Sequence, residues 1–140
     1  MATNLAKFNA ALSKAESKIQ GDFEKFYRQV CLEVLTRVVF RTAVDTGRAR
    51  GNWQLEINAP ASGILDVEGA EGAMADLAIS AAITKLGQIS PFSIVHITNN
   101  VEYIYYLEYD RRSPQHPEGM LEITLTEMEK WLSGINTHIN

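Results

Sequence analysis

The residues that could act in catalysis or bind a metal are few in this sequence and widely spaced. The three histidines, His96, His116 and His138, lack the close spacing of a metal-binding motif. We interpret His96 as a packed residue of an apolar strand and His116 as a polar loop residue. The sequence contains neither a glycine-rich phosphate loop nor a Gly-x-Ser-x-Gly turn. We therefore expect no catalytic residue, no metal and no bound cofactor in this chain.

The single cysteine, Cys31, excludes an internal disulfide and a cysteine-based zinc site. It lies within an apolar helical stretch, so we predict a buried small hydrophobic residue rather than a nucleophile. These features fit a protein that is made in a reducing cytoplasm.

Charged and aromatic residues are concentrated in two short segments. Segment 44–53 reads VDTGRARGNW, and segment 99–109 reads NNVEYIYYLEY. Arginine and glutamate side chains form ion pairs, and tyrosines provide large contact areas that are common at interfaces. The tyrosines therefore have two interpretations: an interface patch, or alternate side chains that pack on a sheet. We expect Trp53 to be a core residue on whose exposed edge Arg48 or Arg50 can stack.

The first segment joins a predicted helix to a predicted strand. Residues 23–43 carry apolar side chains at helical spacing and form the strongest helix of the sequence. The tripeptide DTG at 45–47 follows, and Gly47 tolerates the left-handed backbone of many helix ends. Residues 53–57 then alternate between apolar and polar, which is the period of a half-buried strand.

The second segment follows another predicted strand, residues 92–98. Between the strands, residues 59–73 are small and acidic and indicate a surface loop, and residues 74–86 indicate a packed helix. Two prolines exclude a helix or an inner strand for residues 110–119. Residues 120–132 form the last predicted helix.

The order of these elements predicts an α+β fold, with long N-terminal helices and a C-terminal helix packed on a small antiparallel β-sheet. Residues 1–140 are expected to form a single domain. Residues 4–20 have a narrow apolar stripe, so we expect this N-terminal helix (1–21) to be mobile in the free protein and to dock on a neighbour. The tail 134–140 shows no pattern and is expected to be flexible.

Charge is divided unevenly along the chain, whose net charge is −4. Residues 1–50 hold nine Lys and Arg against five Asp and Glu, whereas residues 51–140 hold four against twelve. Copies of the chain could attract head to tail through these halves, or both charge sets could simply be solvated. A basic patch facing DNA is an alternative to pairing with the acidic half. Its candidate members are Arg37, Arg41, Arg48 and Arg50. No apolar run approaches the ~20 residues that span a bilayer, so no membrane partner is expected.

Together the two segments carry a family resemblance. The string VDTGRARGNW at 44–53 resembles the Val-Asp-Thr-Gly-Arg-x-Arg-x-x-Trp signature of phage head–tail joining and tail-completion proteins. These proteins belong to long-tailed, double-stranded-DNA bacteriophages and prophages. Segment 99–109 resembles the second family segment, in which an aromatic precedes a Glu-Tyr pair, and SPQHPEGM at 113–120 resembles the turn into the last helix. The chain departs from the family at Asp110, where a glycine is expected. The resemblance covers residues 23–132 in order and spacing.

The resemblance implies a non-enzymatic virion component of the phage neck or upper tail, made in the cytoplasm of the bacterial host. Such proteins form rings, usually hexamers, that complete the tail and join it to the DNA-filled head. The implied partners are further copies of the chain, head-completion or connector proteins, and tail-tube or terminator proteins. A passing contact with DNA in the lumen is left open. The alternatives are a tail terminator that caps the length of the tail tube, a minor capsid-associated protein, a host-encoded adaptor, or an enzyme.

The matched segments also imply which residues form the interface or structural motif. These residues are Asp45, Thr46, Gly47, Arg48, Arg50, Trp53, Tyr103, Tyr106, Glu108 and Tyr109. We expect Arg48, Arg50 and Glu108 to hold the two segments together or to join neighbouring subunits. Trp53 and Tyr106 are the expected apolar anchors.

Overall fold

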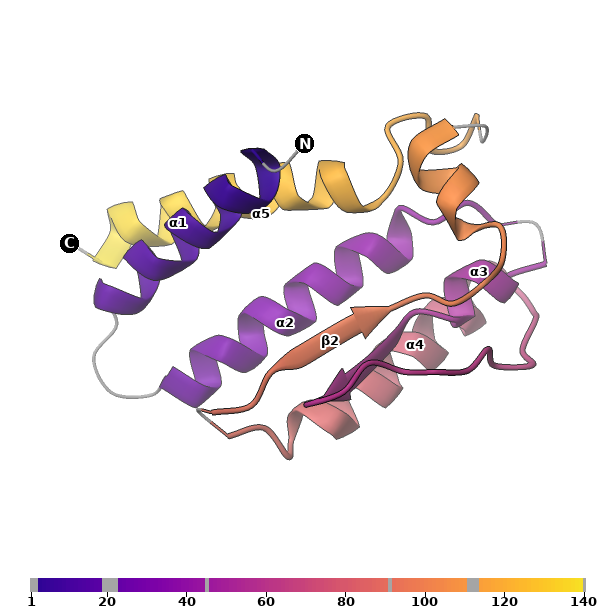
Figure 1. The fold of residues 1–140 in the computed structure, drawn as a ribbon, viewed down its shortest axis with the longest axis horizontal. Coiled ribbons are helices and arrows are strands. Elements are labelled where there is room, and N and C mark those ends of the chain that lie inside the picture. Colours follow the sequence, from indigo (N-terminus) through magenta and orange to yellow (C-terminus); the bar gives the residue numbers. More distant parts are fainter. Residues whose placement is uncertain (1–2, 19–22, 45, 91, 111–113, 140) are drawn as a thin grey trace.

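The structure, a computed structural model, describes residues 3–18, 23–44, 46–90, 92–110 and 114–139. Its elements follow the chain in the order α1 (Thr3–Lys18), α2 (Phe23–Phe40), α3 (Arg48–Gly51), β1 (Gln54–Ile57), α4 (Glu71–Leu86), β2 (Val95–Thr98), η1 (Tyr106–Asp110) and α5 (Leu121–Ile139). The element η1 is a π-helical turn. The helices pack on a two-stranded antiparallel sheet (Figure 1), so the predicted α+β fold class is confirmed.

Helix α2 runs through the middle of the molecule (Figure 1). Its side chains at Leu35, Val38 and Val39 are fully buried, because they share one face at helical spacing. The helix contacts α3, α4 and α5, so it is the element on which most of the fold is assembled. It ends at Phe40, earlier than the predicted end at residue 43.

The sheet pairs β1 with β2 in an antiparallel register that places Leu55 opposite Ile97. The pairing closes at Asn58, whose backbone N–H donates to the Ile94 carbonyl at 2.7 Å. Asn58 has a φ of 70°, the only positive value among non-glycine residues in the described part of the chain. Asparagine tolerates this conformation better than most residues. Strand β2 is shorter than the predicted strand 92–98.

An extended segment without regular structure, residues 58–70, connects β1 to α4 and is held by side-chain amides. Asn52 donates to the Leu65 carbonyl at 3.0 Å and accepts the Leu65 N–H at 2.6 Å. Asn100, which follows β2, donates to the Ala61 carbonyl at 2.8 Å. The segment passes in front of α4 in Figure 1. These bonds fix its course even though it has no backbone ladder of its own.

Two helices extend beyond their predicted bounds. Helix α4 begins at Glu71, inside the predicted loop 59–73. Helix α5 continues to Ile139, so residues 134–139, which we expected to form a patternless tail, belong to a helix. Within the described ranges, none of the helices combines the length and the apolar character needed to cross a bilayer.

Helix α1 lies alongside α5, and the two run in the same direction (Figure 1). Ala11 of α1 is buried in a cluster with Phe26 and Val30 of α2 and with Met128 and Leu132 of α5. The neighbour on which α1 docks in this structure is therefore its own C-terminal helix. The mobility of α1 in the free protein stays a prediction.

Candidate functional site

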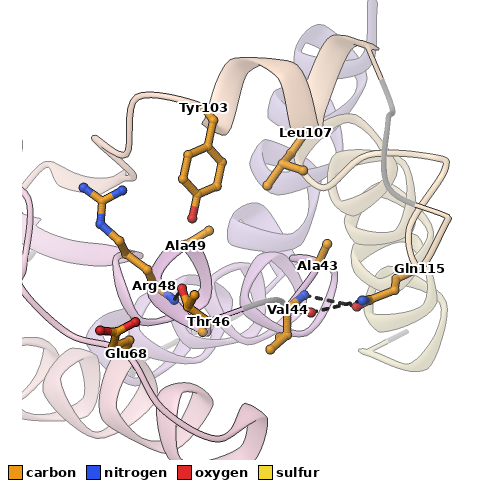
Figure 2. Close-up of a pocket in the computed structure, with 10 residues that line it drawn as sticks. Ala43, Val44, Thr46, Arg48, Ala49, Glu68, Tyr103, Leu107 and Gln115 are labelled. Atoms are coloured by element: carbon orange, nitrogen blue, oxygen red, sulfur yellow. Dashed lines mark hydrogen bonds between the residues drawn. The ribbon is translucent and has the colours of Figure 1, made fainter.

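The three segments that carry the resemblance meet around one open pocket of about 590 Å³. The first segment, residues 44–53, and the second, residues 99–109, both contribute to its walls, and Gln115 adds a side chain from the turn before α5. Figure 2 shows these side chains around the hollow. The full lining consists of Ala43, Val44, Thr46, Gly47, Arg48, Ala49, Glu68, Tyr103, Leu107 and Gln115.

Polar contacts join the three segments at this pocket. Gln115 makes a two-way contact with Val44: its amide N–H donates to the Val44 carbonyl, and its oxygen accepts the Val44 N–H, both at 3.1 Å (Figure 2). Asn99 donates to the Ala49 carbonyl at 2.8 Å. Each of these bonds joins residues that are distant in sequence. The pocket wall is therefore formed by tertiary contacts and not by one local turn.

Arg48 binds the second segment through Glu102. The two guanidinium Nη atoms donate to the two carboxylate oxygens of Glu102 at 2.8 and 3.1 Å, which is the bidentate geometry that arginine favours. The hydrogen bond from Arg48 lowers the pKa of Glu102, and the same bond raises the pKa of Arg48. Within the chain, Glu108 is not the partner of Arg48. Glu102 and Glu108 lie in the same matched segment, so the amino-acid sequence alone could not show which of them is the partner of Arg48.

Gly47 occupies a position that requires glycine. Its φ is 83°, in the left-handed region, and it caps the N-terminus of α3 rather than the C-terminus of α2. A Cβ at this residue would overlap the Gly69 carbonyl oxygen and lie 2.7 Å from Met74 Cγ. The Thr46 carbonyl accepts the Gly69 N–H at 2.8 Å. The glycine thus allows the first segment to lie directly against the chain that enters α4.

Arg50 is almost completely buried, with 2% of its side chain exposed. One Nη donates to the carbonyls of Thr42 at 2.8 Å and Phe40 at 3.3 Å, at the C-terminal end of α2. The other Nη donates to Glu71 at 3.1 Å, in the first turn of α4. The guanidinium also lies 5.7 Å from the Phe40 ring centre, so the aromatic ring that Arg50 contacts is Phe40 and not the expected Trp53. Arg50 thereby ties the end of one long helix to the start of another.

Glu108 is a buried carboxylate that caps α5. Its two oxygens accept the backbone N–H groups of Met120 at 2.9 Å, Leu121 at 2.6 Å and Glu122 at 3.1 Å. A negative charge at a helix N-terminus is favoured by the helix dipole and satisfies N–H groups that have no partner within the helix. Gly119, at φ 82°, permits this approach, because a Cβ there would lie 2.8 Å from the Glu108 carbonyl oxygen.

Trp53 is buried, as predicted, and its indole N–H donates to the Thr42 hydroxyl at 2.6 Å. That hydroxyl donates in turn to the Val38 carbonyl at 2.6 Å. The first segment is therefore bound to the chain that directly follows α2, at Trp53 as well as at Arg50. A role for Trp53 as an anchor between subunits stays a prediction.

The tyrosines lie on the turn and on η1 after the sheet has ended, so the interpretation that alternate tyrosines pack on a strand is wrong. Tyr105, Tyr106 and Tyr109, which we call the tyrosine cluster, are exposed. The rings of Tyr105 and Tyr109 are 4.5 Å apart, and those of Tyr105 and Tyr106 meet edge to face at 6.0 Å. Tyr103 lies apart from this cluster, in the pocket wall (Figure 2). Tyr106 is thus a surface residue and not a core anchor of its own chain.

Four arginines of the first half of the chain, Arg37, Arg41, Arg48 and Arg50, contact carboxylates of the second half. Arg37 and Arg41 both pair with Glu127 of α5, and Arg37 also pairs with Glu33. Together with the pairs of Arg48 and Arg50, these contacts favour pairing within the chain over a basic patch that faces DNA. Asp45, the remaining residue of the predicted motif, lies outside the described residues.

Two side chains of reactive type, Cys31 and His116, have shifted pKa values. Burial raises the pKa of the Cys31 thiol to about 12, so the thiol is protonated at neutral pH, and its predicted burial is confirmed. Burial, followed by the charges of Arg50 and Arg41, lowers the pKa of His116. Among the described residues, no three His, Cys, Asp or Glu side chains are grouped so that they could hold a metal ion.

Comparisons of this chain with protein-family models, with curated proteins and with solved structures find no match. The site is therefore defined by its own geometry: three chain segments fixed around an open pocket, with an exposed tyrosine cluster on the adjoining turn.

Proposed function

We propose that this chain is a structural virion protein of the neck or upper tail of a long-tailed phage. In this role it completes the tail and joins it to the DNA-filled head as a ring of copies. Its partners are then head-completion or connector proteins on one side and tail-tube or terminator proteins on the other. The proposal combines the sequence resemblance with the geometry of the three matched segments.

The observation that carries the proposal is the convergence of these segments in space. Gly47, Arg48, Arg50 and Glu108 each make a contact that their residue type is suited to make, and each contact joins distant parts of the chain. A chance match of short strings gives no reason for such convergence. It is expected if the strings specify one fold shared with the family.

The exposed surface supports a role in protein contacts. The tyrosine cluster lies beside the pocket on a short turn, and tyrosine supplies contact area at a low cost in conformational entropy. The arginines that could have contacted DNA are engaged with carboxylates, so the proposal does not depend on DNA binding.

Electron microscopy of a lysate from a phage or prophage that lacks this gene tests the proposal. Filled heads beside separate tails of normal length are the expected result. Overlong or ragged tail tubes would identify a tail terminator instead, and defective heads would indicate a capsid-associated protein. Fully assembled, infectious particles would contradict every phage role and leave a host adaptor or an enzyme to be considered.

A further inference from the structure

The extended segment between β1 and α4 presents two different faces. Val67 packs against α3, since a Cβ on Gly51 would lie 3.0 Å from Val67 Cγ2. Leu65 lines a hollow beside α4, although part of its side chain is exposed. Ile64, Asp66 and Glu68 are exposed, and Glu68 also lines the pocket of the candidate site. We call these three residues the acidic strip: one apolar side chain followed by two carboxylates.

A groove of opposite character lies between α2 and α4. Its volume is about 550 Å³, and its floor is formed by Leu32, Ile83 and Leu86, with Ile83 53% exposed. Lys25 and Arg28 stand at its rim. The Nε of Arg28 donates to the Leu86 carbonyl at 3.0 Å, which fixes the side chain. One Nη of Arg28 also forms an ion pair with Glu24 at 3.3 Å. We call this surface the basic groove.

The acidic strip and the basic groove lie on opposite faces of α4. Leu65, next to the strip, shares its hollow with Ala81 and Lys85 of α4. A helix turns by about 100° per residue, so Ile83 points about 200° away from Ala81. The hydrogen bonds from Asn52 and Asn100 hold the segment on its own side. The strip of one chain therefore cannot enter the groove of the same chain.

We propose that the acidic strip of one copy docks in the basic groove of the next. Ile64 enters the apolar floor, and Asp66 and Glu68 face Lys25 and Arg28 at the rim. The two surfaces match in both respects, apolar against apolar and acidic against basic. Such a contact joins unlike surfaces, and contacts of this kind generate rings when the rotation closes. This inference deepens the proposed ring-forming role and rests on it for the choice of a second copy as partner.

Disulfide trapping in the purified full-length chain tests the contact directly. The variant Ile64→Cys/Ile83→Cys should give a ladder of covalent multimers under a mild oxidant such as diamide. Native Cys31 is buried, so it does not compete. Either single variant should give no covalent dimer, because the contact joins unlike surfaces and does not bring two copies of the same thiol together. The matched control Ile64→Cys/Lys130→Cys places the second thiol on exposed α5 and should also stay monomeric on a non-reducing gel. A ladder that is equal in both double variants, or absent from both, overturns the proposal.

Charge reversal provides an independent measurement that does not depend on thiols. Lys25→Glu, and separately Asp66→Lys/Glu68→Lys, should each weaken self-association about tenfold or more in sedimentation, because like charges then face each other. An equal mixture of the two variants should recover association, since each variant supplies what the other lacks. Recovery fails if the strip and the groove do not contact each other, and that result overturns the proposal.

The outcomes separate this inference from the proposed function. If the phage lacking the gene yields heads beside tails but the trapped ladder is absent, the neck role stands and this interface is wrong. If the ladder forms but the phage assembles normally, self-association stands and the neck role is wrong. Binding of the acidic strip to a different protein, with no self-association, would also overturn the interface.

Discussion

Gly47 and Glu108 each allow a close approach between parts of the chain that lie far apart in sequence. The glycine permits contact with the Gly69 carbonyl at a positive φ, and the glutamate satisfies three N–H groups at the start of α5. Both contacts are internal to the chain. At the scale of single residues, these two members of the motif stabilise the folded chain. Any effect of their replacement on assembly would follow from the loss of that stability.

Gly47→Ala should destabilise the protein by about 2 kcal/mol or more, from the left-handed backbone and from the overlap with Gly69. The control is Gly72→Ala, in the first turn of α4, where an added Cβ meets nothing within 4 Å. That change should be neutral or stabilising by up to ~1 kcal/mol, because alanine favours helix. Urea unfolding followed by tryptophan fluorescence measures both. Equal effects of the two changes would contradict the role given to Gly47.

Glu108→Ala should cost about 2–4 kcal/mol, since it removes a buried charged acceptor and leaves three N–H groups without it. Glu118→Ala removes an exposed carboxylate a short distance along the chain and should change stability by less than ~0.5 kcal/mol. The same unfolding assay compares them. If Glu108 acted only between subunits, its replacement would leave the stability of the isolated chain unchanged.

His116 makes stability depend on pH. Its pKa is lowered from 6.5 in the folded chain, so the unfolded chain binds more protons as the pH falls through 6.5. The contribution of neutral His116 to the free energy of unfolding is therefore fully present above pH 6.5. It decreases as the pH falls below 6.5, and the decrease ends once the pH is below the pKa of His116 in the folded chain. His116→Gln should therefore reduce the loss of unfolding free energy between pH 7.5 and 5.5. An unchanged pH profile would show that another group titrates.

At the scale of elements, Arg50 connects α2, α3 and α4. Its guanidinium is buried and bonded to two carbonyls, whereas its carboxylate partner Glu71 is 70% exposed. Glu71→Gln should cost less than ~1 kcal/mol, because the Glu71 carboxylate is largely solvated and Arg50 keeps its two carbonyl acceptors. Arg50→Lys should cost about 2–4 kcal/mol, because an ammonium group cannot span both carbonyls and Glu71. Chemical unfolding measures the order, and the reverse order would contradict the connecting role.

The main elements could be predicted from the sequence because their apolar residues repeat with a clear period. Examples are the helical spacing of apolar residues in α2 and the alternation of apolar and polar residues through β1. Helix α3 and the π-helical turn η1 were not predicted, since each is too short to show a period. The partners of the motif charges were also missed. The choice of Glu102 by Arg48 and of Glu71 by Arg50 depends on how those short turns orient the side chains.

At the scale of the whole molecule, α1 packs mainly against a single element, α5. Among its residues 4–12, Ala11 alone is buried, in the cluster that it forms with α2 and α5. We expect the amides of α1 to exchange with solvent much faster than those of α2 in the isolated chain, and to become protected in the assembled ring. Hydrogen exchange with mass spectrometry measures this. Equal protection of α1 and α2 in the monomer would contradict assembly-dependent ordering.

The measurement that tests the central claim most directly is the position of this chain in purified phage particles. Antibody labelling of intact virions, viewed by electron microscopy, should place the chain at the junction of head and tail. The separate heads and tails expected from a phage that lacks the gene provide the control for antibody specificity. Label confined to the capsid surface or the distal tail tip, or particles that contain none of the chain, would contradict a role in joining the tail to the head.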